Sequence, residues 1–92
     1  MLADMNTLSR RYGCGVSLEI LKWFATPNTA AIEIDKNTSR AARDVSASMV
    51  RDGLVTVKTY PLPETYGKEY MVPTNTCWEL VGFMKGQGLL KS

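Results

Sequence analysis

The sequence predicts a small α+β domain that is mostly helical. Apolar residues recur at spacings of three and four in several segments, which places them on one face of a helix. Two further segments, 55–60 and 68–72, are rich in β-branched and aromatic residues and flank a proline-containing loop, a pattern typical of a β-hairpin. The length of 92 residues, with 45% hydrophobic and 22% charged residues, indicates one folded globular domain over 1–92.

Two helices are expected before residue 26. The first is an N-terminal extension over 1–13, and its apolar face comprises Leu2, Met5, Leu8 and Tyr12. Glycines at 13 and 15 interrupt it, because glycine weakens helix continuation. The second helix runs from about Val16 to Ala25, and its wide apolar stripe predicts deep burial, with both Trp23 and Phe24 in the core.

A short helix from Asn28 or Thr29 to about Lys36 is expected next, because small and branched apolar residues follow a capping side chain. A turn at Asn37 then leads into a helix over 39–52, capped by Thr38 or Ser39. Gly53 ends this helix, as glycine commonly does. The helix is expected to bury Ala42, Val45 and Met49 and to expose Arg40, Arg43, Asp44, Ala47 and Arg51.

The second half of the chain predicts a hairpin over 54–72 and a C-terminal helix and tail over 76–90. Thr76 and Glu79 match a capping box at the start of that helix. Its apolar face comprises Cys77, Leu80, Val81 and Met84. The predicted core of the domain includes Ile20, Leu21, Phe24, Ile32, Val45, Met49, Leu54, Val57 and Met71.

The composition argues against an enzyme and against a bound metal or cofactor. There is no histidine, so histidine-based catalysis is excluded, and two distant cysteines supply too few ligands for a usual zinc site. Free thiols at Cys14 and Cys77 are preferred to a disulfide. No apolar run approaches the roughly 18–20 residues of a membrane span. Asp4 stands where a signal peptide would be basic, so we expect a cytoplasmic protein with no membrane partner.

The formal net charge of +2 is too small to indicate a nucleic-acid ligand by itself. Its distribution is more informative. The segment 36–68 contains six basic and three acidic residues, a balance of +3, and the remainder contains five basic and six acidic residues, a balance of −1. Positive charge therefore gathers around the helix over 39–52.

The order of helices and hairpin, with Arg51-Asp52-Gly53-Leu54-Val55 at the junction, resembles a winged helix-turn-helix domain. The similarity is to small bacterial, archaeal or phage regulators of the MarR and ArsR type, and it covers about 16–85. It implies a three-helix core and a two-stranded wing over 16–72, with extra helices at both ends. Met49 stands where the family usually has leucine.

This resemblance implies a sequence-specific double-stranded DNA-binding protein that regulates transcription. The helix over 39–52 would enter the major groove and the hairpin over 54–72 would be the wing. The implied DNA contacts are Thr38, Ser39, Arg40, Arg43, Asp44, Ala47, Lys58, Thr65 and Lys68. Arg40 and Arg43 would reach base edges, and Thr38 and Ser39 would bind phosphate. Asp44 is a departure, since it would repel phosphate unless it accepts from a cytosine amino group.

Two alternatives remain open at this stage. The apolar faces of the first and last helices either form a homodimer surface or pack within their own domain. The modest charge and Asp44 also suit a winged-helix protein-interaction module, such as a small phage or accessory protein that binds a larger complex. Neither the operator nor a small-molecule effector can be predicted from these residues.

Overall fold

The computed structural model describes residues 4–26, 30–35, 37–59 and 68–90. Within these ranges the chain forms four helices and a three-stranded antiparallel sheet, which confirms the predicted α+β class. The elements in chain order are α1 (Met5–Tyr12), α2 (Gly15–Ala25), β1 (Ile32–Ile34), α3 (Arg40–Arg51), β2 (Val55–Thr59), β3 (Glu69–Pro73) and α4 (Asn75–Gly86).

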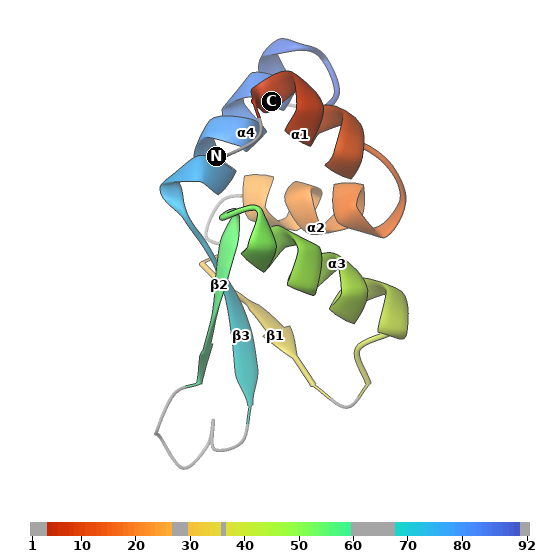
Figure 1. Ribbon diagram of the computed structural model, residues 1–92, viewed down its shortest axis with the longest axis vertical. Coiled ribbons are helices and arrows are strands. Elements are labelled where there is room, and N and C mark those ends of the chain that lie inside the picture. Colours follow the sequence, from red (N-terminus) through yellow and green to blue (C-terminus); the bar gives the residue numbers. More distant parts are fainter. Residues whose placement is uncertain (1–3, 27–29, 36, 60–67, 91–92) are drawn as a thin grey trace.

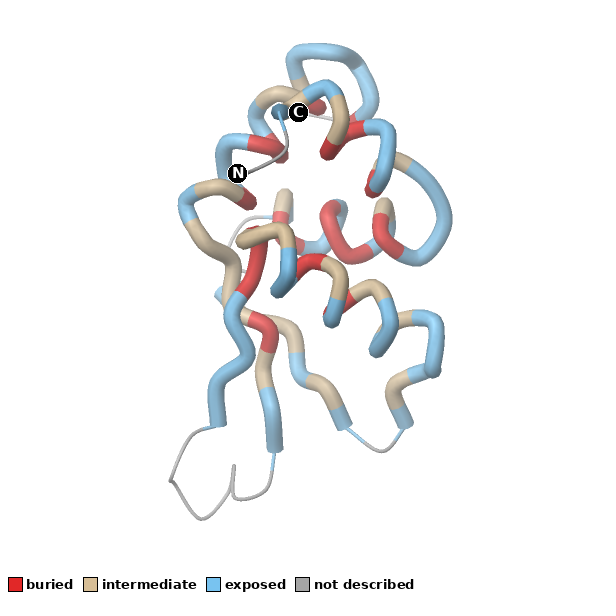
Figure 2. The backbone as a smooth tube through the Cα atoms, in the orientation of Figure 1, coloured by how far each residue is buried: buried red, intermediate tan, exposed pale blue. Residues whose placement is uncertain are grey.

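Helices and sheet occupy different ends of the molecule. Helices α1, α2 and α4 gather at one end, and the sheet extends away from them with α3 beside it (Figure 1). Buried residues concentrate between the helices and at the near ends of the strands, while the far halves of the strands are exposed (Figure 2). The sheet thus projects beyond the core that anchors it.

The core joins all four helices to β2 and β3. It comprises Leu8, Tyr12, Ile20, Leu21, Phe24, Met49, Leu54, Val55, Met71, Cys77, Leu80, Val81, Met84 and Leu90. Among the predicted core residues, Ile32 and Val45 are half-buried against this cluster. Val57 was expected in the core, but it is 39% exposed because β2 extends past the helices. The other six predicted core residues are buried.

The predicted helix over 28–36 is wrong, because residues 32–34 form β1. Ile32 pairs with Met71 and Ile34 with Glu69, in a sheet of order β1-β3-β2. The predicted two-stranded wing is therefore part of a three-stranded sheet. Residues 27–29 and 36 lie outside the described part of the chain, and within that part no helix directly precedes α3. The three-helix core expected from the winged-helix resemblance is not found there.

Two details of the α2 and α4 helices also differ from expectation. Trp23 is 61% exposed, while its neighbour Phe24 is buried, so the apolar stripe of α2 is narrower than predicted. The residue that caps α4 is Thr74 rather than Thr76: its Oγ1 accepts a hydrogen bond from the Cys77 amide at 3.4 Å. The predicted buried face of α4 is confirmed.

Gly53 ends α3 as the sequence predicts. Its φ of 76° lies in the left-handed region that side chains disfavour. The Gly53 amide donates to the Val50 carbonyl, and the Leu54 amide donates to the Met49 carbonyl at 2.8 Å. These two bonds form a Schellman motif, which satisfies the last carbonyls of the helix and directs the chain into β2.

Candidate nucleic-acid interface

The start of α3 is held by its own cap. Ser39 Oγ accepts a hydrogen bond from the Ala42 amide at 3.1 Å, which makes Ser39 the N-cap. Thr38 Oγ1 instead accepts from the Asp35 amide at 2.9 Å. Both hydroxyls that were predicted to bind phosphate therefore have intramolecular partners. Ser39 can still donate its own hydroxyl proton.

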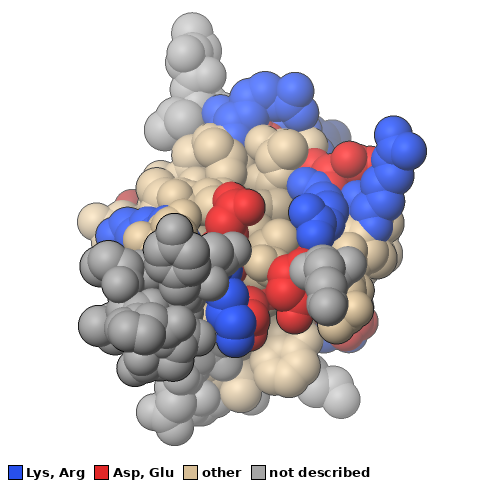
Figure 3. All heavy atoms as spheres, turned by 90° about the horizontal axis from the view of Figure 1, so that it is seen from below, with Lys and Arg blue, Asp and Glu red and all other residues tan. Residues whose placement is uncertain are grey.

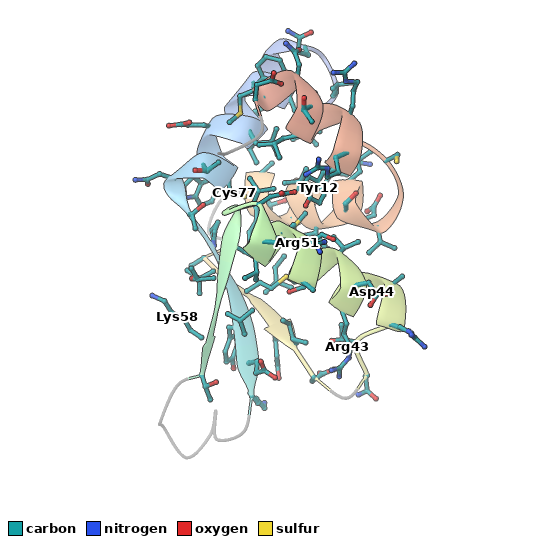
Figure 4. The ribbon with its side chains drawn as sticks, viewed as in Figure 1. Tyr12, Arg43, Asp44, Arg51, Lys58 and Cys77 are labelled. Carbon is teal, nitrogen blue, oxygen red and sulfur yellow. The ribbon has the colours of Figure 1, made fainter. Side chains whose placement is uncertain are left out.

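Arg43 was predicted to reach a base, but its guanidinium contacts the turn between β1 and α3. Its Nε donates to the Thr38 carbonyl at 3.3 Å, and its Nη2 donates to the Asp35 carbonyl. The side chain remains exposed. Figure 4 shows it at the turn, beside the end of α3 that lies far from the core.

The outward face of α3 carries three of the predicted contact residues. Arg40, Asp44 and Ala47 are exposed, and Arg51 continues the same line toward the end of the helix. The Arg51 guanidinium donates to Ser48 Oγ at 3.1 Å, and Arg40 has no hydrogen bond or ion pair among the described residues. The small side chain of Ala47 lets a partner approach the helix backbone closely at the middle of this face.

A cluster that sequence reasoning missed holds the other end of α3. Asp52, the residue after the helix, accepts a hydrogen bond from Tyr12 at 2.5 Å and one from Arg11 Nη1 at 2.6 Å. The Arg11–Asp52 pair is also an ion pair. The spacing of residues within each helix does not predict this contact, because its partners belong to different helices far apart in the sequence.

The charges of this cluster explain the pKa shifts around it. Burial alone would raise the pKa of the Asp52 carboxyl, but the hydrogen bonds from Tyr12 and Arg11 outweigh burial and lower that pKa. For Tyr12, burial and then the hydrogen bond to Asp52 raise the pKa to about 12. Asp52 is therefore charged and Tyr12 neutral at physiological pH, so the cluster acts as a fixed tie between α1 and α3.

The predicted wing contacts do not lie beside the α3 face. Side chains alternate along a strand, so Lys58 leaves the sheet on the side opposite to Val57 and its partner Met71, which belongs to the core. Figure 4 shows Lys58 pointing away from α3. Lys68 forms an ion pair with Glu33 of β1 at 3.4 Å. The remaining predicted wing contact, Thr65, lies outside the described residues.

The charge pattern at this end of the molecule is mixed. Viewed from the end where the sheet projects, basic and acidic side chains alternate and do not merge into one basic field (Figure 3). Asp44 on α3 and Glu33 on β1 are both exposed acids. A nucleic acid would therefore meet separate arginines, and the electrostatic attraction would be modest.

The apolar faces that suggested a homodimer are used inside the domain. Leu8 and Tyr12 of α1 and Leu80 and Met84 of α4 all belong to the core. These described residues therefore pack within their own domain, while Leu2 of the first face lies outside the described residues. The homodimer stays a prediction. The predicted free thiols are confirmed, with Cys14 exposed and Cys77 buried, and burial raises the pKa of Cys77 to about 12.

No family model matches this sequence, and no curated protein or solved structure matches it either. In the described part of the chain, no helix is both long and apolar enough to cross a membrane. No cluster of side chains suited to a metal ion occurs among those same residues.

Proposed function

We propose that the protein binds double-stranded DNA in a sequence-specific way and regulates transcription, with the outward face of α3 in the major groove. The observation that carries this proposal is the exposure of Arg40, Ala47 and Arg51 along one line of a helix fixed at both ends. The major groove admits an α-helix, and rigid placement of a helix favours specific contacts.

Each residue on this face has a role in the proposal. Arg40 has no competing partner among the described residues and pairs with guanine through two donors. Arg51 contacts phosphate, since it lies near the end of the helix. Ala47 allows close approach and packs against a thymine methyl group. Asp44 accepts a hydrogen bond from a cytosine amino group. The hairpin flanks the helix, with its tip outside the described residues.

A second candidate function is a protein-interaction module. Exposed tryptophans favour it, because aromatic side chains are enriched in protein interfaces. Trp23 is 61% exposed and Trp78 is 44% exposed. Asp44 and the mixed charge seen in Figure 3 point the same way. The absence of a described helix directly before α3 also removes one of the usual anchors of a helix-turn-helix domain.

Fluorescence polarisation with random duplex DNA at low salt separates the two candidates. A DNA-binding protein retains non-specific affinity that falls steeply as salt increases. A selected duplex then tests the face, with Arg40→Ala compared with Lys58→Ala, which removes the same charge from the opposite side of the sheet. Arg40→Ala should weaken binding by about 1–3 kcal/mol, and Lys58→Ala should weaken it less.

Two outcomes contradict this proposal. If the parent protein binds no duplex at low salt, the protein-interaction function takes its place. If Lys58→Ala weakens binding as much as Arg40→Ala does, the outer face of the sheet, and not α3, meets the DNA.

A further inference from the structure

Arg43 occupies a particular place in the first turn of α3. Its backbone amide donates to the Ser39 carbonyl at 3.0 Å, the hydrogen bond that closes the first helical turn. Its side chain reaches past the cap, with Nε on the Thr38 carbonyl and Nη2 on the Asp35 carbonyl. One residue thus joins the helix, its cap and the end of β1.

The turn that Arg43 contacts is dense with hydrogen bonds. The Thr38 amide donates to the Asp35 carbonyl at 3.1 Å, and the Asn37 amide donates to Asp35 Oδ1 at 2.8 Å. The Asp35 carbonyl therefore accepts from both Thr38 and Arg43, which uses both of its lone pairs. A guanidinium is suited to this task, because its planar fork offers two parallel donors to two acceptors.

The position of the Arg43 guanidinium also offsets an unfavourable electrostatic interaction. A positive side chain near the N-terminus of a helix is disfavoured by the helix dipole. Two carbonyl oxygens on the Arg43 fork offset this repulsion by offering partial negative charge to the guanidinium. The fork edge is then occupied, so pairing with a base through this edge would require both bonds to break.

We infer that Arg43 is a positioning residue: its guanidinium fork clamps the turn between β1 and α3 and sets the direction in which α3 leaves the sheet. The clamp stands where a helix-turn-helix domain would have its preceding helix. The effect of this clamp on DNA recognition rests on the proposed function. Its effect on the conformation of the turn does not. Base contact then falls to Arg40, which lies in the same turn of α3.

The test compares Arg43→Ala, Arg43→Lys and Arg40→Ala. Amide hydrogen exchange of residues 35–42 reports on the turn, and polarisation with a selected duplex reports on binding. Arg43→Lys keeps the charge but lacks the fork, and Arg40→Ala removes an equal charge from the same helix turn. Both Arg43 variants should speed exchange of the Thr38 amide by about tenfold, the scale expected for loss of a hydrogen bond from a charged group. Arg40→Ala should leave that exchange unchanged.

The binding measurements separate positioning from contact. Arg43→Lys should weaken binding to the selected duplex as much as Arg43→Ala does, because the fork and not the charge is required. Unchanged exchange of the Thr38 amide in Arg43→Lys overturns the inference, as does full rescue of binding by lysine. If the parent binds no duplex, the proposed function fails, and the exchange rates alone still decide whether Arg43 clamps the turn.

Discussion

The phenolic oxygen of Tyr12 lies 2.5 Å from Oδ2 of Asp52, and this hydrogen bond joins the end of α1 to the end of α3. Arg11 binds the same carboxylate oxygen from the exposed side. Together with the Arg43 clamp at the other end of the helix, this contact leaves α3 fixed at both termini. The outward face of α3 is therefore presented by a rigid support.

The first prediction concerns the strength of this tie. Tyr12→Phe keeps the buried ring and removes only the hydroxyl donor, so it should lower the free energy of unfolding by roughly 1–3 kcal/mol, the scale for a hydrogen bond to a charged group. Urea denaturation measures the change. In an Asp52→Ala background the same substitution should cost much less, because its acceptor is gone. Equal costs in the two backgrounds would show that the Tyr12 hydroxyl contributes without its hydrogen bond to Asp52.

A second prediction follows from the raised pKa of Tyr12. Burial and the bond to Asp52 raise this pKa to about 12 from an ordinary 10.0. Between these values the unfolded chain releases the phenolic proton and the folded chain keeps it, so the stability that Tyr12 contributes is present below pH 10 and is lost as the pH rises toward 12. The difference in unfolding free energy between the parent and Tyr12→Phe should therefore be constant near neutral pH and shrink across this window. A difference that stays constant up to pH 12 contradicts the assigned shift.

The elements that could be predicted from the sequence are those with local signals. The helix over 39–52 has a cap at Ser39, an apolar stripe ending at Met49 and a terminating glycine at Gly53, and all three signals lie within the segment. The hairpin strands likewise show their alternation locally. These elements appear in the structure close to their predicted bounds.

The elements that could not be predicted depend on distant partners. Ile32 and Ile34 alternate with Glu33, which suits a strand, but a three-residue segment becomes a strand only by pairing with β3. Trp23 and Phe24 are neighbours in α2 and both were predicted to be buried. Only the packing of the neighbouring helices decides that Phe24 is buried and Trp23 is exposed. The pattern of neighbouring residues predicts neither the β1 strand nor the exposure of Trp23.

The same distinction holds for the candidate interface. Exposure of Arg40, Asp44 and Ala47 follows from helical periodicity and was predicted correctly. The bond of Asp52 to α1 joins residues far apart in the sequence. The bonds of Arg43 are local, but they depend on the conformation of the turn after β1, a segment that was predicted to be the end of a helix, so the sequence could not distinguish a clamp from a base contact. Residue type and spacing alone made Arg40 and Arg43 look equivalent.

A third prediction tests the assigned register of α3. Met49 is fully buried, while its neighbour Val50 is 44% exposed. Met49→Ala should cost roughly 2–5 kcal/mol, because it removes a large core side chain and leaves a cavity. Val50→Ala should change stability by only about 0.5 kcal/mol or less. Thermal or urea unfolding of the two variants measures both values, and similar costs would place the wrong side of α3 in the core.

A fourth prediction distinguishes the observed cap of α4 from the one expected from the sequence. Thr74 Oγ1 accepts from the Cys77 amide and donates to the Gly53 carbonyl at 2.6 Å, so it links α4 to the end of α3. Thr74→Val keeps the shape and removes the hydroxyl, and it should cost about 1–2 kcal/mol. Thr76→Val is the matched control, and its effect should be clearly smaller. A larger loss for Thr76→Val in urea unfolding would restore the predicted capping box.

The last prediction uses Asp44, the acid within the outward face of α3. It is exposed and has no ion pair among the described residues, so its removal should leave stability nearly unchanged. A carboxylate on a DNA-contacting face repels phosphate, and Asp44→Asn should therefore bind random duplex more tightly than the parent at low salt. The same variant should lose preference at one C·G base pair of a selected duplex, because its amide oxygen is a weaker acceptor for the cytosine amino group.

Polarisation titrations on random and selected duplexes measure both effects of Asp44→Asn, and Glu79→Gln on α4 is the matched control. Glu79 is also an exposed helical acid, but it lies on the helix at the opposite end of the molecule from the far ends of the strands. Its substitution should change general affinity less, because Glu79 would lie farther from the DNA and the repulsion between two charges falls with their separation. If the two variants tighten random-duplex binding equally, the gain reflects net charge alone. The outward face of α3 then does not lie against DNA, and the exposed tryptophans become the better guide to what the protein binds.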